Sequence, residues 1–162
     1  MSAYSFKKAA SRLVVGLMIV QFIPLDRINP PETSPVKAPV KITAILEKSC
    51  FDCHSFRTKW SAPAYIAPAS WAASAMVSGG RRALNFSEWD NANTTIAVHR
   101  MRAVRKTVLE GSGHQPLYYG LYPQSRMSTE ERTLLLNWID SYDRKQLTGF
   151  KNSGSTLRDK SF

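Results

Sequence analysis

Two cysteines and a histidine stand within five residues of one another, in the segment Cys50-Phe51-Asp52-Cys53-His54. They are the only cysteines of the 162-residue chain. The order C-x-x-C-H is the pattern to which a c-type haem is attached. Each thiol forms a thioether with one vinyl group of the macrocycle, and the histidine that follows becomes a ligand of the iron. We therefore expect one covalent haem c, with Cys50 and Cys53 as attachment points and His54 as the proximal ligand.

Three other kinds of site use the same residue types. A thioredoxin-like redox pair needs a βαβ context, and the sequence shows no pattern for one. A disulfide across two intervening residues would close too small a loop to stabilise the fold much. Zinc needs four ligands, which the two cysteines would complete only with two of the three histidines. These alternatives stay open, but the order and spacing favour haem.

The iron of such a haem has a second axial position. The candidate ligands after the motif are Met76, Met101, Met127, His99 and His114. Met101 lies on the apolar face of a predicted helix and His99 on its basic side, so we expect core packing and a solvated surface, respectively. Met127 directly precedes a helix cap and is placed to act as a hydrophobic staple. His114 lies in a glycine-rich loop, where a small cytochrome c commonly presents its distal ligand. We expect His114 in that role, with an exposed loop histidine as the alternative.

The first 28 residues have the pattern of a targeting segment. Lys7, Lys8 and Arg12 precede an apolar run over residues 13–24. The run has the length of a signal-peptide core and is shorter than the roughly 20 residues of a membrane span. We expect a signal peptide or signal-anchor over 1–28, with a buried core helix as the alternative. The remainder would then lie in the bacterial periplasm, tethered to the inner membrane if the signal is uncleaved.

The net charge of +10 would suit a nucleic-acid-binding protein. Export argues against such a partner, so we expect none. The predicted helix over 91–110 carries the basic residues Arg100, Arg102, Arg105 and Lys106. They favour an acidic redox partner. Anionic lipid headgroups and an ordinary solvated face are the alternatives.

Periodicity predicts a mostly α-helical domain, because no stretch alternates with a period of two. Four prolines make residues 29–39 an extended tether. The domain is expected over 40–144, and a flexible polar tail over 145–162. A capping box at 128–131 and a similar signal at 87–90 each predict the start of a helix. Gly79 and Gly80 predict the end of one. The predicted helices cover residues 41–49, 69–78, 91–110 and 129–142.

The stretch from Gln21 to Tyr142 resembles a bacterial haem-binding domain family of exported, single-haem, cytochrome c-like proteins. The blocks that carry the resemblance are 20–27 with 29–31, 50–55 with Trp60, 65–71, 80–82 with 84–89, and 116–119 with Pro123 and 128–131. It implies a cytochrome c-like single domain of about four helices around one covalently attached haem, with an N-terminal signal or anchor helix. Where the family usually has Met-Pro-Pro, this sequence has His114-Gln115-Pro116. This departure makes bis-histidine ligation, with a lowered reduction potential, our hypothesis.

Aromatic and basic side chains complete the predicted site. We expect the aromatic residues either to line the haem crevice or to fill the core. The two arginines would either pair with the haem propionates or form a solvated surface pair. These candidates are Trp60, Tyr65, Trp71 and Tyr118, and Arg81 and Arg82.

The function expected from this sequence is single-electron transfer by an exported monohaem cytochrome. No catalytic acid or base stands out beside a substrate pocket, so we do not expect an enzyme. One alternative is a haem-based gas or redox sensor, or a ligand-binding module, with an open or displaceable sixth position. Another is a haem subunit of a larger oxidoreductase.

Overall fold

The computed structural model describes residues 3–89, 94–110 and 116–158, and these residues form a helical protein. The elements are α1 (Ala3–Val20), α2 (Val40–Ser49), α3 (Phe51–His54), η1 (Ala62–Tyr65), α4 (Ala69–Ala83), α5 (Thr94–Glu110), α6 (Pro116–Leu121), η2 (Pro123–Ser125) and α7 (Thr129–Arg158). Within these ranges the only β pairing is an isolated bridge between Ser34 and Glu88. The prediction of a mostly α-helical fold is confirmed. The four predicted helices correspond to α2, α4, α5 and α7, whereas the short α3 and α6 were not predicted.

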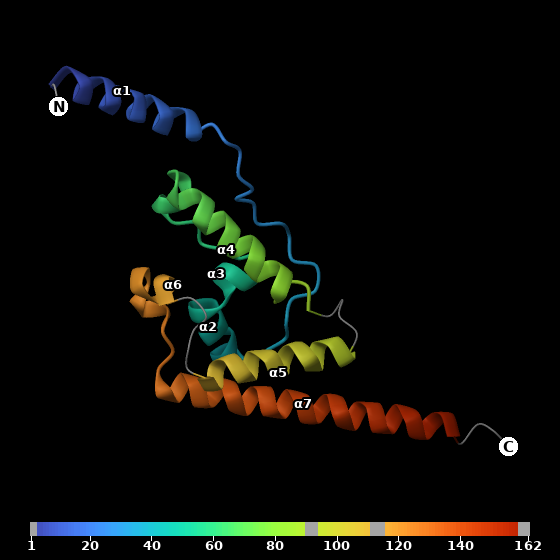
Figure 1. Ribbon diagram of the computed structural model, residues 1–162. Helices are drawn as coiled ribbons and strands as arrows, with labels where there is room; N and C mark the ends of the chain where they lie inside the picture. Colours follow the sequence, from blue (N-terminus) through green and yellow to red (C-terminus); the bar gives the residue numbers. More distant parts are fainter. Residues whose placement is uncertain (1–2, 90–93, 111–115, 159–162) are drawn as a thin grey trace.

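The core lies where α2, α3, α5 and α7 meet. Figure 1 shows α5 and α7 side by side and antiparallel at one end of the molecule, with α4 beside α3 and α1 projecting from the other end. The buried apolar residues are Ile42, Ile45, Leu46, Phe51, Phe86, Trp89, Ala97, Met101, Val108, Leu135 and Ile139. Phe51 belongs to this core, so the C-x-x-C-H segment joins directly onto it.

The apolar face predicted for α5 is confirmed. Ala97, Met101 and Val108 are buried, and Val104 packs against them. Met101 is completely buried in the core, as the sequence predicted. On another side of this helix two ion pairs reach α7, Arg102 with Asp143 and Arg105 with Asp140. Exposed ion pairs of this kind contribute little stability, but they neutralise part of the predicted basic face.

The predicted end of α4 at Gly79-Gly80 is wrong, because the helix continues to Ala83. A Cβ atom at Gly80 would overlap the carbonyl oxygen of Cys53 and lie 2.9 Å from its carbonyl carbon. Gly80 is therefore needed for the close approach of α4 to α3 and does not act as a helix stop. A glycine inside a helix costs about 1 kcal/mol relative to alanine. The tertiary contact outweighs this local preference.

The capping role predicted for Ser87 is wrong, whereas the helix start predicted near residue 91 lies outside the described residues. Ser87 lies in a turn, and its hydroxyl accepts a hydrogen bond from Phe56 N (2.9 Å) and donates one to Glu32 (2.7 Å). Glu88 takes part in the isolated bridge to Ser34. The serine that resembled a helix cap instead joins three segments that are distant in the sequence.

The capping box at the start of α7 is confirmed. Glu131 N donates to Ser128 Oγ (3.2 Å), and Ser128 N donates to Glu131 Oε2 (2.7 Å). Lys48 Nζ also donates to this carboxylate, which links α2 to α7. The helix continues to Arg158 rather than ending near Tyr142. A polar helical segment needs no buried face, so the loss of apolar periodicity did not mark its end. The flexibility of residues 145–162 stays a prediction.

Replacing Ser128 with alanine is expected to destabilise the protein by about 1 kcal/mol, because it removes the acceptor for a backbone N–H at a helix start. Urea unfolding measures the change. Thr133→Ala on the same exposed helix is the control, since its hydroxyl bonds only to the carbonyl of Thr129 in its own helix. An equal loss in both variants would contradict a specific role for the cap.

The same carboxylate gives stability a defined pH dependence. The hydrogen bond from Lys48, and then that from Ser128 N, lower the pKa of Glu131 below its usual range. The contribution is therefore complete above the ordinary glutamate pKa and is lost as the pH falls through the lower folded-state pKa. Glu131→Gln should flatten this part of the profile in urea unfolding between neutral pH and about pH 3. An unchanged profile would contradict the assignment.

The N-terminal helix and the segment after it differ in their contacts. The apolar side chains of α1 are mostly exposed, including Leu13, Met18 and Ile19. Within the described residues, none of the helices combines the length and hydrophobicity needed to cross a membrane. The following segment has no helix, and Val36 N donates to Phe86 O (2.8 Å), while Ser34 N donates to Ser87 O (3.2 Å). These bonds hold the predicted tether against the domain.

Candidate functional site

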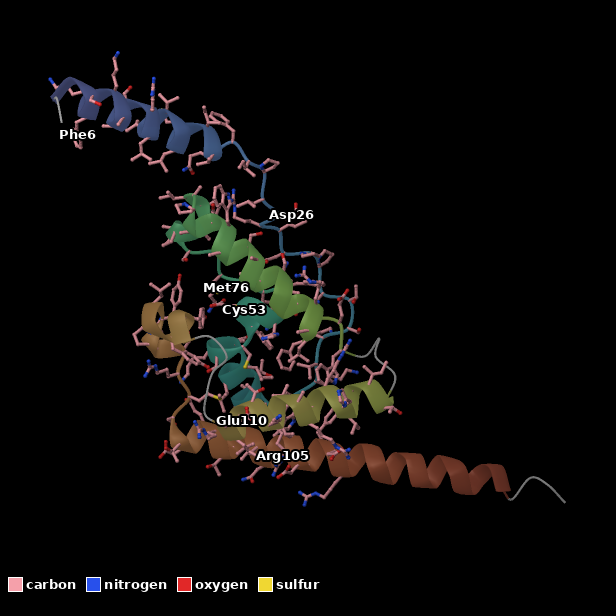
Figure 2. All side chains as sticks on the ribbon, in the orientation of Figure 1. Phe6, Asp26, Cys53, Met76, Arg105 and Glu110 are labelled. Carbon is pink, nitrogen blue, oxygen red and sulfur yellow. The ribbon has the colours of Figure 1, made fainter. Side chains whose placement is uncertain are left out.

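The two thiols and the imidazole lie on a single helical turn. Cys50 O accepts hydrogen bonds from Cys53 N (3.2 Å) and His54 N (2.9 Å), which closes the turn of α3. Both cysteines are free thiols and half-buried. Figure 2 shows Cys53 near the middle of the molecule, close to α4. The turn thus presents the three side chains to one part of the interior.

These three residues line a cavity of about 810 Å³. This volume falls within the usual range of small-molecule and cofactor pockets, roughly 300–1,000 Å³. Residues from α5, from α6 and from the start of α7 also contribute to its lining. Its apolar residues are Ala83, Leu84, Phe86, Ala103, Val104, Val108 and Met127. The cavity suits a large, mostly apolar ligand.

Two carbonyl groups determine which nitrogen of His54 carries the proton. Nδ1 lies 2.9 Å from Gly80 O and 3.1 Å from Leu84 O. Because a carbonyl oxygen only accepts, Nδ1 must be the N–H donor in the neutral imidazole. The lone pair is then on Nε2, and hydrogen bonding at the other nitrogen makes the ring a more basic metal ligand. This is the tautomer that an axial histidine requires.

Burial keeps the two thiols protonated. It is the largest cause that raises the pKa of Cys50 to about 12 and of Cys53 to about 11. A smaller contribution comes from Cys53 for the first thiol and from Asp52 for the second. Across the described ranges, no three His, Cys, Asp or Glu side chains are grouped to hold a metal ion. The pair therefore consists of neutral thiols beside an apolar cavity.

Tyr118 connects α6 to the helical turn of the motif. Its hydroxyl donates to Asp52 Oδ2 (2.7 Å), and Lys59 N donates to the other oxygen of that carboxylate (3.0 Å). Burial raises the pKa of Tyr118, so the phenol stays protonated. Asp52, one of the two residues between the cysteines, is thus held at both of its carboxylate oxygens.

A family model described as "Haem-binding domain" matches residues 15–141, which is most of the chain. The chain belongs to the haem-binding domain family. No curated protein matches the chain, and no solved structure matches it. Membership of this family identifies haem as the cofactor. The His54 ring with an N–H at Nδ1, the two neighbouring thiols and the apolar cavity fit that group.

The haem-binding domain does not bring all the predicted aromatic residues to this cavity. Tyr118 lines it, but Trp60, Tyr65 and Trp71 are not among its lining residues. Tyr65 and Trp71 are exposed, and the guanidinium of Arg27 lies 4.9 Å from the centre of the Tyr65 ring. The loop before α4 and the first turn of that helix place these three side chains outside the cavity lining. The expectation that they line the crevice is therefore not met by this cavity.

Arg81 and Arg82 are also absent from the cavity lining. Arg81 Nε donates to Ser55 O (2.8 Å), and its terminal nitrogens donate to Ile28 O (2.9 Å) and Asn29 Oδ1 (2.8 Å). Arg82 is exposed. Because of its position on α4, the guanidinium of Arg81 binds the segment at residues 28–29 and the carbonyl of Ser55. Desolvation by burial lowers the pKa of Arg81.

Arg81→Ala is therefore expected to release the segment around residues 28–29 and to destabilise the fold by about 1–3 kcal/mol, because backbone carbonyls lose charged donors. Limited proteolysis and amide hydrogen exchange would detect faster cleavage and exchange in that segment. The neighbouring Arg82→Ala is the control and should leave both unchanged. Equal exchange in the two variants would contradict the role of Arg81.

Several cavity residues were missed or assigned elsewhere by the sequence. Arg126 and Arg132 line the cavity, although neither belongs to a recognisable motif. Arg100 and His99, which the sequence placed on a basic surface, also line it. The predicted distal ligand His114 lies outside the described residues. Helical periodicity separates the apolar face of α5 from its polar residues, but it does not show that α6 and the start of α7 enclose His99 and Arg100 in a cavity.

Proposed function

We propose that this haem-binding protein is a monohaem c-type cytochrome that transfers single electrons. Cys50 and Cys53 would hold one haem through thioethers, and His54 would be its proximal iron ligand. The observation that supports the proposal best is the tautomer of His54, whose Nδ1 is held by two carbonyls of α4 beside two thiols. When bound, the haem supplies one-electron exchange at its iron.

The residues of the chain perform the remaining tasks. His54 provides an imidazole whose orientation is set by the carbonyls of Gly80 and Leu84. The protonated thiols supply both the sulfur and the hydrogen that add across each vinyl double bond, so attachment needs no oxidant. Apolar residues of α5, including Val104 and Val108, would pack against the haem. An apolar environment would limit how far the surrounding dipoles reorient when the bound haem gains or loses an electron.

We propose His114 as the second axial ligand, which gives bis-histidine ligation. Imidazole favours oxidised iron more than a thioether sulfur does, so the reduction potential should be low for this family. The absorption spectrum of the oxidised protein tests the ligand. A weak far-red band characteristic of methionine sulfur would contradict it, and rapid carbon monoxide binding to the reduced protein would favour the sensor alternative.

We also propose that the protein functions in the bacterial periplasm, tethered to the inner membrane where the N-terminal segment is retained. Exposed apolar side chains on α1 and the nearby Lys7, Lys8 and Arg12 support this location. They are suited to an apolar boundary next to anionic headgroups. The net charge of +10 supports an acidic redox partner. Sequencing the N-terminus of the mature protein would show whether the segment is cleaved.

Intact-protein mass spectrometry tests the central proposal. The full chain is produced in a bacterium that has a haem-attachment system, and its mass is measured under denaturing conditions. We expect an increase equal to one haem, with both cysteines resistant to alkylation. A denatured chain at the mass of the polypeptide alone, with two alkylated cysteines, would contradict covalent attachment.

A further inference from the structure

Three arginines line the cavity from elements other than α3. Arg100 belongs to α5, Arg126 lies between η2 and α7, and Arg132 is in the first turn of α7. Together they bring three positive charges to a cavity whose other lining residues are largely apolar. Arg100 and Arg132 are half-buried and Arg126 is exposed, so a negatively charged ligand in the cavity would gain favourable contacts with all three.

Within the described ranges, none of the three forms an ion pair with a carboxylate, whereas Arg102 and Arg105 of the same α5 helix do. The guanidinium of Arg126 lies 5.9 Å from the centre of the Tyr119 ring, a cation–π distance. The one carboxylate described in the lining, Asp52, already accepts bonds from Tyr118 and from Lys59 N. The cavity lining therefore has a surplus of positive charge.

We infer that Arg100, Arg126 and Arg132 bind the two propionate carboxylates of the haem, in place of the Arg81 and Arg82 that the sequence favoured. The inference rests on the proposed haem site in this cavity. A guanidinium presents parallel N–H donors that match a carboxylate, and the low polarity of the lining strengthens that contact. The arginines thereby orient the macrocycle and offset its negative charge.

The test compares haem with its dimethyl ester, in which both carboxylates are neutral. The full chain carrying Cys50→Ala and Cys53→Ala is titrated with each compound, and binding is followed by absorbance. We expect haem to bind more tightly than the ester by about tenfold or more. Adding Arg100→Gln, Arg126→Gln and Arg132→Gln should abolish this preference. Adding Arg82→Gln, Arg102→Gln and Arg105→Gln lowers the net charge equally and should keep it.

A second measurement covers the case in which the cysteine-free chain folds poorly. In the covalently loaded protein, the three cavity substitutions should lower the reduction potential, because nearby positive charges disfavour oxidised iron and their removal makes that state more stable. The three control substitutions should change the potential less. Equal affinity for haem and its ester, or equal potentials in the two triple variants, would overturn the propionate assignment while haem binding stands. Failure of the unsubstituted chain to take up haem would overturn the proposed function and this inference together.

Discussion

Alanine in place of both Cys50 and Cys53 is expected to yield a protein whose haem is removed completely by acidified acetone. Without the thiols no thioether forms, and only the bond to His54 and the cavity contacts remain. Each single substitution should keep one thioether and retain the haem after denaturation. Haem staining of a denaturing gel and intact mass measure this difference, which is all or none for the double variant.

Ser49 provides the matched control for these substitutions. It lines the same cavity next to Cys50, and within the described part of the chain its buried hydroxyl oxygen has no hydrogen-bond partner. Ser49→Ala should therefore leave covalent haem intact and change stability little, because no satisfied bond is lost. Haem that remains attached to the double alanine variant after denaturation would refute the assignment of the two thiols.

Gly80→Ala is the second substitution with a large expected effect. The new Cβ would overlap the carbonyl oxygen of Cys53 and lie 3.0 Å from its Cβ. The atoms in conflict belong to two packed helices, so α3 and α4 must separate to relieve the overlap. The same glycine supplies a carbonyl to His54 Nδ1. We expect a loss of about 3 kcal/mol in urea unfolding, together with a changed spectrum of the bound haem.

Gly79→Ala tests the same helix one residue earlier. Nothing lies within 4 Å of a Cβ atom at Gly79. Alanine is the better helix former, so this variant should gain about 0.5–1 kcal/mol. A gain in stability for Gly79→Ala together with a loss for Gly80→Ala would identify packing against Cys53 as the cause of the loss. A gain in stability for Gly80→Ala would contradict the close approach of α3 and α4 at this residue.

The elements that sequence reasoning predicted correctly depend on local chemistry. The capping box of Ser128 and Glu131 joins residues three apart, so its hydrogen bonds follow from the sequence spacing alone. The buried face of α5 follows from helical periodicity at Ala97, Met101 and Val108. The C-x-x-C-H motif is likewise recognised from five consecutive residues, without any knowledge of distant parts of the chain. Haem as the cofactor was expected from these residues and agrees with the family to which the chain belongs.

The errors occur where a contact joins residues that are far apart along the chain. Gly80 was interpreted as a helix stop, because no local signal indicates that Cys53 lies against it. Ser87 resembled a helix cap, but its hydroxyl bonds to Glu32 and to Phe56 N. Arg81 seemed available to a propionate until its bonds to Ile28 and Ser55 were known. Each residue has several plausible local roles, and the partner selects one.

The sequence by itself determined the helical class, the capped start of α7 and the five-residue motif of two thiols and an imidazole. These features depend on interactions within a few residues. Only the tertiary structure decided which nitrogen of His54 carries the proton and which arginines face the cavity. Those outcomes depend on carbonyl groups and helix faces brought together from α3, α4, α5 and α7. The direction of a side chain relative to a distant element is a property of packing, so it could not be obtained from spacing along the chain.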